Sequence, residues 1–283
     1  MRTLALAALA AALLGACSST AATPQAASPA PSVAGSARAS ASASTEAVDL
    51  TVFAAASVSG VLDKVKPAYE TTHPGTTLTV STDSSAALEA KIEQGAPADV
   101  FLSADTANPQ KLVQRGLSAG EPVVFAVNRL AIVVASGNPG GIASPADLAK
   151  SGVKVIAAGD EVPITKYARQ LVDNLAKEPG YPTDFAAAYG RNVVSKEDNV
   201  KAVMGKVELG EGDAAIVYAT DAKASTKVAT VDIPGDANVP ASYAGAVVGA
   251  SSHQEAAKAF LRWLTSPDGS AILTSFGFLA PAG

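Results

Sequence analysis

The sequence VDLTVFAAAS, residues 48–57, decides the class of fold because it passes from a strand pattern into the start of a helix. Residues 48–53 are rich in β-branched and aromatic side chains, which is typical of a buried strand. Apolar residues then recur at spacings of three and four from Val58 to Tyr69, which predicts one face of a helix. Residues 77–80 repeat the strand pattern. The chain therefore begins its folded part as a strand–helix–strand unit.

The same alternation continues to the end of the chain. Further strands are expected at residues 99–102, 123–127, 130–134, 153–157, 192–194, 214–218, 227–231 and 243–248. Helical spacings separate many of them, and two helices are expected at the end of the chain. Repeated alternation predicts an α/β protein with mixed, mostly parallel sheets covered by helices. The extended stretch 123–134 is either one long strand or two segments that lead into a second domain.

The first residues have the pattern of an export signal. An apolar core of under about 18 residues follows Arg2, which is too short for a permanent membrane span. This core ends at Leu-Gly-Ala-Cys, residues 14–17, which resembles the lipobox of bacterial lipoproteins. We therefore expect residues 1–16 to be a signal peptide that is removed. Cys17 should then carry a lipid that holds the protein at the extracytoplasmic side of the cell membrane.

The segment after Cys17 has the composition of a tether. Residues 18–47 are almost entirely Ala, Ser, Thr and Pro, and they contain no Leu, Ile, Phe, Tyr or Trp. Such a segment has no apolar surface to bury against a core. We expect residues 17–47 to be a lipidated, disordered tether.

The composition also excludes several classes of site. Cys17 is the one cysteine, so the chain has neither an internal disulfide nor a thiolate metal cage. Two histidines argue against a zinc enzyme, and a net charge of −5 offers no electrostatic footprint for nucleic acid. We expect no cofactor, no free metal cation and no nucleic-acid partner.

Polar residues gather where expected strands pass into expected helices. Such junctions are where ligands bind in α/β sheets, and the first turn of a helix offers free N–H groups to an anion. Serines at these positions are also good N-caps, and Ser57 is one such candidate. Four junctions of this kind nevertheless favour an anion site. They are at residues 54–57, 81–85, 162–165 and 196–200.

A set of ordered motifs resembles the molybdate-binding proteins of bacterial ABC importers. The resemblance covers residues 49–279, and Ser275 stands where that family often has an aromatic residue. The motifs are TVFAAAS (51–57), SSAAL (84–88), IEQGAPADVFLSAD (92–105), GDEVP (159–163), EDNV (197–200), AIVYATDA (215–222) and SFGF (275–278).

The resemblance implies a two-domain fold like that of type II periplasmic binding proteins, with a hinge between the domains. Residues 49–127 together with 233–283 would form domain 1, and residues 128–232 would form domain 2. The ligand would be molybdate or tungstate, and the sequence does not separate these two anions. The partner would be the permease of an ABC importer. The protein would act as a monomer and would not be an enzyme.

The resemblance also implies which residues hold the anion. Ser57 and Ser85 would supply hydroxyl and N–H donors from the first domain. The backbone N–H of Val200 and the hydroxyl of Tyr218 would act from the second domain. The remaining N–H falls on Ile164, where the family often has a small residue followed by glycine. The hydroxyl of Thr165 is the alternative donor there.

Two other functions stay open at this point. A binding protein for sulfate, phosphate or another oxyanion is the near alternative, and an exported serine hydrolase is the distant one. The hydrolase motifs are incomplete, because Ser57 does not lie in G-x-S-x-G. Residues 151–154 fit S-x-x-K, but neither K-T-G nor S-D-N accompanies them.

Overall fold

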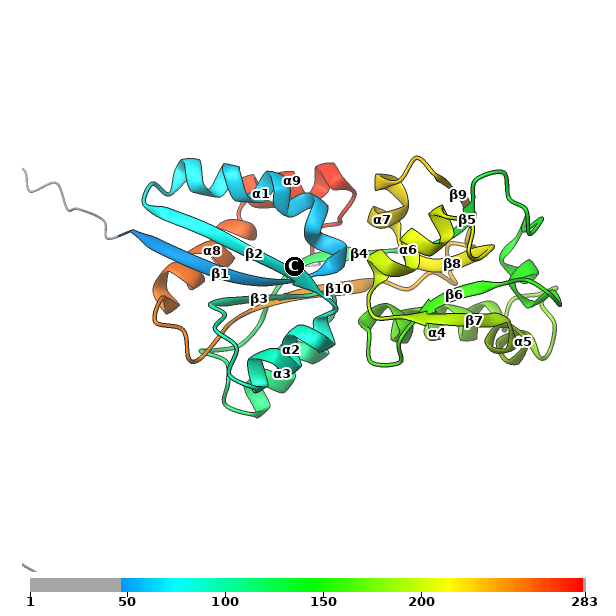
Figure 1. The fold of residues 1–283 in the computed structure, drawn as a ribbon, viewed down its shortest axis with the longest axis horizontal. Coiled ribbons are helices and arrows are strands. Elements are labelled where there is room, and N and C mark those ends of the chain that lie inside the picture. The colour runs from blue at the N-terminus through cyan, green and yellow to red at the C-terminus, as the bar shows by residue number, and fades with distance from the viewer. Residues whose placement is uncertain (1–46, 282–283) are drawn as a thin grey trace, which may run out of the picture. The chain divides into compact units, whose positions relative to one another are not determined.

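The computed structural model describes residues 47–281, which contain two five-stranded sheets with helices packed on them (Figure 1). The expected signal peptide, the Cys17 anchor and residues 17–46 of the expected tether lie outside the described residues. Among the residues that are described, no helix is both long and apolar enough to cross a membrane.

The first sheet has the strand order β2-β1-β3-β10-β4. Strand β1 pairs in parallel with β2 and β3, whereas β10 is antiparallel to β3 and β4. The strands are β1 (Val48–Ala55), β2 (Thr76–Asp83), β3 (Val100–Ser103), β4 (Val123–Asn128) and β10 (Ala241–Val247).

Helices cover both faces of this sheet (Figure 1). The helices α1, α8 and α9 pack on one another on one face, and α2 packs on α3 on the other. A short 3₁₀ helix, η1, leads from β1 into α1. The bounds are η1 (Ala56–Val58), α1 (Ser59–Thr72), α2 (Ser85–Glu93), α3 (Ala107–Gln114), α8 (Gln254–Leu264) and α9 (Pro267–Phe276).

The second sheet has the strand order β7-β6-β8-β5-β9. Strand β6 is parallel to β7 and β8, and β5 is antiparallel to β8 and β9. The strands are β5 (Leu130–Ala135), β6 (Val155–Ala158), β7 (Val193–Glu197), β8 (Ala214–Tyr218) and β9 (Val228–Val231). The helices are η2 (Pro145–Ala149), α4 (Pro163–Leu175), α5 (Phe185–Asn192), α6 (Val200–Glu208) and α7 (Ala219–Ala224).

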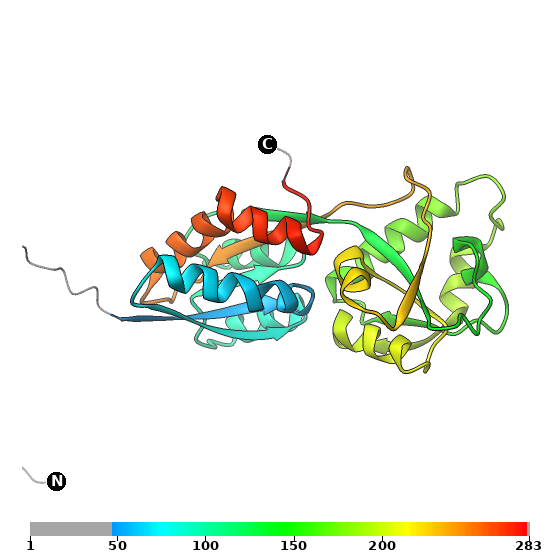
Figure 2. The same cartoon turned by 90° about the horizontal axis from the view of Figure 1, so that it is seen from above.

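The extended stretch 123–134 divides at Arg129 into β4 and β5, which belong to different sheets. The chain passes back between β9 and β10, beside the first crossing (Figure 2). The two crossings are tied together because the Asn238 side chain both accepts from the N–H of Leu130 and donates to its carbonyl oxygen, each at 3.0 Å. Two adjacent crossings thus connect the two sheets.

These observations confirm the α/β class with mixed sheets. Each sheet combines two parallel and two antiparallel pairings, because one strand in each runs against its neighbours. The expectation that the sheets would be mostly parallel is therefore wrong. Three short helices, α3, α5 and α7, were not expected from the sequence. Asn192 closes α5, so the strand expected to start there begins one residue later.

Candidate functional site

A small cavity lies where the first turns of η1, α2, α4 and α6 meet the end of β8. All five residues that the resemblance implies as ligand contacts line it, two from elements on the first sheet and three from the second. The complete lining is Ala55, Ala56, Ser57, Ser84, Ser85, Ala104, Val162, Pro163, Ile164, Asn199, Val200 and Tyr218.

Two of the helices that end at the cavity are capped in the same way. The Ser84 side chain accepts from the N–H of Ala87 at 3.3 Å, and the Asn199 side chain accepts from the N–H of Ala202 at 3.1 Å. These caps satisfy the third N–H of each helix. The first N–H, on Ser85 in α2 and on Val200 in α6, has no acceptor within its own helix. Both N–H groups therefore present positive dipole ends to the cavity.

Helix α4 offers one N–H group for a different reason. Pro163 occupies its first position and has no N–H, so Ile164 carries the first donor of the helix. The Thr165 hydroxyl donates to the carbonyl oxygens of Ala158 and Gly159, at 3.0 and 2.8 Å. Its proton is thus directed to the end of β6, and Thr165 does not line the cavity. This geometry favours the Ile164 N–H over the Thr165 hydroxyl.

The hydroxyls of Ser57 and Ser85, the two serines expected to bind the ligand, both form hydrogen bonds within the protein. Ser57 lies inside η1, whose N-cap is Ala55, so the interpretation of Ser57 as an N-cap is wrong. Its Oγ lies 2.9 Å from the hydroxyl oxygen of Tyr243. The Oγ of Ser85 accepts from the N–H of Ala104 at 2.9 Å. Ser84 caps α2, so the Ser85 hydroxyl is not needed as a cap and can accept from Ala104.

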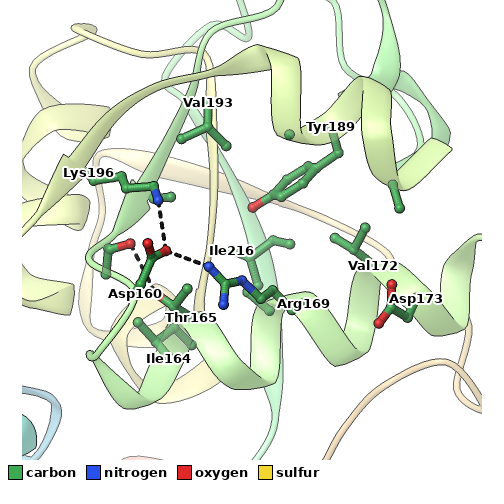
Figure 3. Close-up of a pocket in the computed structure, with 15 residues that line it drawn as sticks. Asp160, Ile164, Thr165, Arg169, Val172, Asp173, Tyr189, Val193, Lys196 and Ile216 are labelled. Atoms are coloured by element: carbon green, nitrogen blue, oxygen red, sulfur yellow. Dashed lines mark hydrogen bonds and ion pairs between the residues drawn. The ribbon is translucent and has the colours of Figure 1, made fainter. Parts of the chain in front are cut away.

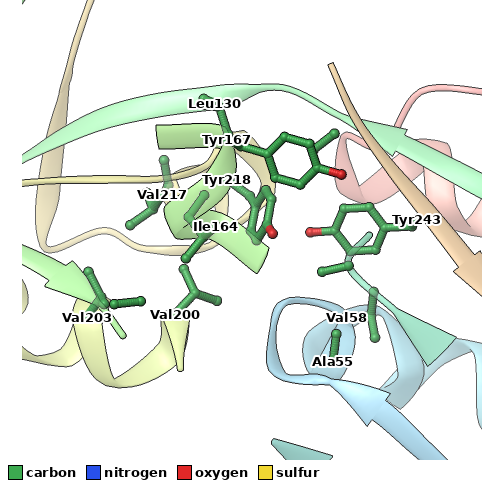
Figure 4. Packing of buried hydrophobic residues seen from close by; sticks show 14 of the residues in the cluster. Ala55, Val58, Leu130, Ile164, Tyr167, Val200, Val203, Val217, Tyr218 and Tyr243 are labelled. Carbon is green, nitrogen blue, oxygen red and sulfur yellow. The ribbon is translucent and has the colours of Figure 1, made fainter. Parts of the chain in front are cut away.

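Tyr218, the last residue of β8, has a buried hydroxyl with no hydrogen-bond partner among the described residues. Its side chain is 1% exposed, and burial, followed by the nearby Tyr243 and Tyr167, raises its pKa well above the ordinary range. The hydroxyl is therefore protonated and can donate. Leaving such a group unpaired costs about 1–3 kcal/mol, so an acceptor in the cavity would relieve a real penalty. Figure 4 shows the three tyrosines side by side.

The field in the cavity does not come from cationic side chains. Its lining contains neither Lys nor Arg, so N–H dipoles and hydroxyl groups set the local potential. Within residues 47–281, no group of three or more His, Cys, Asp or Glu side chains could hold a metal ion. The chemistry of the lining suits an anion that accepts hydrogen bonds.

A larger cavity of about 340 Å³ lies behind α4, between this helix, α5 and β7 (Figure 3). It contains the cationic side chains of Arg169 and Lys196. Both pair with the carboxylate of Asp160, with Lys196 at 2.7 Å. Asp173 also lines this cavity, so its two cationic and two anionic side chains balance, and much of the remaining lining is apolar. This cavity is less suited to a small dianion than the one at the helix N-termini.

Sequence reasoning missed two polar residues next to the site. Tyr243 was expected only as part of a strand, and Asn128 only as a link between extended segments. Both are fully buried. The Tyr243 hydroxyl bonds to the Ser57 hydroxyl, and the Asn128 amide bonds to the Tyr243 hydroxyl. Each bond joins residues more than 100 positions apart in the sequence. No local pattern in the sequence could have signalled these contacts.

Known proteins match the chain over nearly all of its folded part. The family model of the bacterial extracellular solute-binding proteins matches residues 50–279. Molybdate-binding protein ModA of Mycobacterium tuberculosis is 36% identical over 236 residues, which are 83% of this chain and 86% of that protein.

Two solved structures share the fold. The periplasmic molybdate-binding protein of Azotobacter vinelandii matches with a TM-score of 0.69 and 22% identity, over 82% of this chain and 100% of that one. The sulfate-binding protein SubI of Mycobacterium tuberculosis matches with a TM-score of 0.72 and 23% identity, over 82% and 86%. Similarity of fold therefore does not distinguish a molybdate-binding from a sulfate-binding protein. The match over residues 50–279 shows that the chain belongs to the bacterial extracellular solute-binding proteins.

Proposed function

We propose that this protein captures molybdate or tungstate in the cavity at the helix N-termini and delivers it to the permease of an ABC importer. The buried, unpartnered hydroxyl of Tyr218 carries the proposal, because it requires an acceptor in the cavity. The serine hydroxyls and the N–H groups of Ile164 and Val200 supply further donors around the same cavity. The 36% identical relative that is named a molybdate-binding protein supports this ligand.

The donor set favours an oxyanion that carries no proton. Backbone N–H groups can only donate, and the Oγ atom of Ser85 already accepts a hydrogen bond from the protein. A cage of hydrogen-bond donors binds a fully deprotonated dianion more tightly, because the O–H of a protonated ligand would find no acceptor in it. Molybdate and tungstate meet this condition. Sulfate meets it too, and is the second candidate because the donor set would also serve it.

We propose further that the two sheets belong to two domains, residues 49–127 with 233–283 and residues 128–232. The two adjacent crossings between the sheets would then form the hinge. The cavity has room of about 10 Å³, which is enough for roughly one water molecule. A tetrahedral oxyanion is larger, so its entry would require the two domains to separate slightly at the cavity.

We infer from the lipobox that the mature protein begins at Cys17 and is held by lipid at the outer side of the cell membrane. Residues 1–16 would be the signal peptide, and the segment up to residue 47 would be the tether. The site contains donors for an anion, which supports a binding protein rather than an enzyme. We propose that this protein acts as a monomer.

Titration calorimetry of the mature chain tests the proposed ligand. Molybdate and tungstate should bind with a stoichiometry of one, more tightly than sulfate, and phosphate should bind least. Tighter binding of sulfate than of molybdate would move the assignment to the second candidate. Release of acid from a simple ester would instead support the hydrolase alternative.

A further inference from the structure

We propose that Tyr243 determines the specificity of the site by fixing the Ser57 hydroxyl as a hydrogen-bond donor to the ligand. The inference rests on the proposed function and deepens it. Tyr243 does not line the cavity. It acts on the ligand through Ser57, so it is a positioning residue.

The arrangement begins at the crossing between the sheets, where the Asn128 side chain is completely buried. The N–H of Arg129 donates to Oδ1 of Asn128 at 2.9 Å, which fixes the orientation of the amide. The Nδ2 group therefore faces Oγ1 of Thr220, at 2.9 Å, and the hydroxyl oxygen of Tyr243, at a longer 3.5 Å. The amide supplies a proton to both oxygens.

The next hydrogen bond joins the hydroxyls of Tyr243 and Ser57, whose oxygens lie 2.9 Å apart, and on geometry alone either could donate. The Tyr243 oxygen already accepts from Asn128, and among the described residues Oγ of Ser57 is the acceptor within reach of the Tyr243 proton, so we take Tyr243 as the donor. Once Oγ of Ser57 accepts this bond, its own proton must point elsewhere. Ser57 lines the cavity, so the cavity is where that proton can find an acceptor. A series of hydrogen bonds thus runs from Asn128 through Tyr243 and Ser57 to the ligand.

The Tyr243 ring is held in place on several sides. The rings of Tyr218 and Phe278 each meet it edge-on with centroids 5.4 Å away, and that of Phe125 does so at 6.1 Å. The side chain is completely buried. Its hydroxyl therefore has little freedom to leave Ser57.

A serine hydroxyl that is free to turn can either donate to an oxyanion or accept from a protonated one. The bond from Tyr243 takes one of the two lone pairs of Ser57 Oγ and leaves the Ser57 proton facing the cavity, which favours donation to the ligand over acceptance from it. The N–H of Ala104 has the same effect on Ser85, but only proline would remove that N–H, and it would also constrain the backbone. Tyr243 is therefore the side chain whose removal should relax the discrimination against protonated oxyanions such as hydrogen phosphate.

The test combines Tyr243→Phe, Ser57→Ala and the double variant, with molybdate and inorganic phosphate as probes in calorimetry near neutral pH. Tyr243→Phe should weaken molybdate binding about tenfold and leave phosphate binding unchanged or tighter. The ratio of the two affinities should therefore fall about tenfold. In the Ser57→Ala background, Tyr243→Phe should cause no further loss, because the hydroxyl that it positions is gone.

Tyr69→Phe is the matched control, since Tyr69 is a buried tyrosine of α1 that does not line the cavity. It should leave both affinities unchanged. Any unfolded fraction would lower the stoichiometry of binding and leave the affinity of the folded fraction readable. An equal loss for molybdate and phosphate, or the same loss with and without Ser57, would overturn the role of Tyr243. If the unsubstituted protein binds no molybdate, the proposed function itself fails.

Discussion

The rings of Tyr218 and Tyr243 meet at 65° with centroids 5.4 Å apart, although the two residues belong to different sheets. Edge-on aromatic contacts of this kind contribute about 0.5–1.5 kcal/mol beyond the area they bury. Among the described residues the Tyr218 hydroxyl has no hydrogen-bond partner, whereas the Tyr243 hydroxyl bonds to Ser57. The contact between the sheets and the candidate site are therefore built from the same side chains.

Replacing Tyr218 with Phe should weaken molybdate binding about 10–100-fold, because a hydrogen bond to a charged group contributes roughly 1.5–3 kcal/mol. The ligand-free protein should not lose stability, since the hydroxyl has no partner to lose among the described residues. Calorimetry and thermal unfolding measure the two quantities. Tyr189→Phe is the control, because Tyr189 is a buried tyrosine of α5 that lines the larger cavity. Unchanged affinity in Tyr218→Phe would remove this hydroxyl from the site.

Cationic side chains should contribute little to binding. Arg169→Ala and Lys196→Ala should each change molybdate affinity less than about threefold, because these cations pair with Asp160 away from the proposed site. Added monovalent salt should also have a small effect on a cage of buried dipoles. Titrations at low and high salt check both points. Loss of binding in either variant, with Tyr218→Phe unaffected, would indicate a charge-paired site.

Asp221 should make stability depend on pH. Burial raises the pKa of its carboxyl from 3.8 to about 7, against the opposing effect of Lys201, whose Nζ lies 3.5 Å from Oδ1. The folded state thus favours the protonated form, and stability should fall as pH rises from about 4 to about 7. Asp221→Asn should stabilise the protein by roughly 2–4 kcal/mol at about pH 8 and by little at about pH 4.

Chemical denaturation of the parent and of Asp221→Asn at both pH values measures this difference. Asp173→Asn, which alters a carboxylate of α4 that lines the larger cavity, serves as the control. An equal effect of Asp221→Asn at the two pH values would show that the Asp221 carboxyl does not titrate in this range.

Cys17→Ser should release the protein from the membrane fraction without changing its affinity for molybdate. Deletion of residues 18–45 should leave affinity unchanged as well, because the segment has almost no apolar side chain with which to pack. Cell fractionation followed by calorimetry of the released protein tests both expectations. Retention of the Cys17→Ser protein in membranes would count against the lipobox.

Much of the fold could be predicted because the strands and helices have strong local patterns. The strand expected at residues 214–218 is found as β8. The apolar spacing expected from Val58 to Tyr69 becomes the buried face of α1 from Val61 onward, and Val58 itself lies in η1. The pairing of the strands was less accessible. Strand β10 follows all five strands of the second sheet in the sequence but pairs with β3 and β4 of the first. A local sequence pattern does not predict such a distant pairing.

The candidate site shows the same division. The structure brings Ser57, Ser85, Ile164, Val200 and Tyr218 to one cavity, where strand–helix junctions and the family resemblance placed them. The hydrogen bonds of these residues could not be predicted. The partner of Ser57 is 186 residues away in the sequence. Ser57 was expected to cap the helix after β1, but it lies inside η1 and caps no helix. Local sequence thus predicts which groups are present, and tertiary contacts decide which way each one donates.

A crystal structure of the protein with molybdate, located by the anomalous scattering of the metal, would show directly where the anion binds. We predict one strong peak within hydrogen-bond reach of the Ser57 and Ser85 hydroxyls, the Tyr218 hydroxyl and the N–H groups of Ile164 and Val200. A peak in the larger cavity beside Arg169 and Lys196, or none at the helix N-termini, would contradict the account.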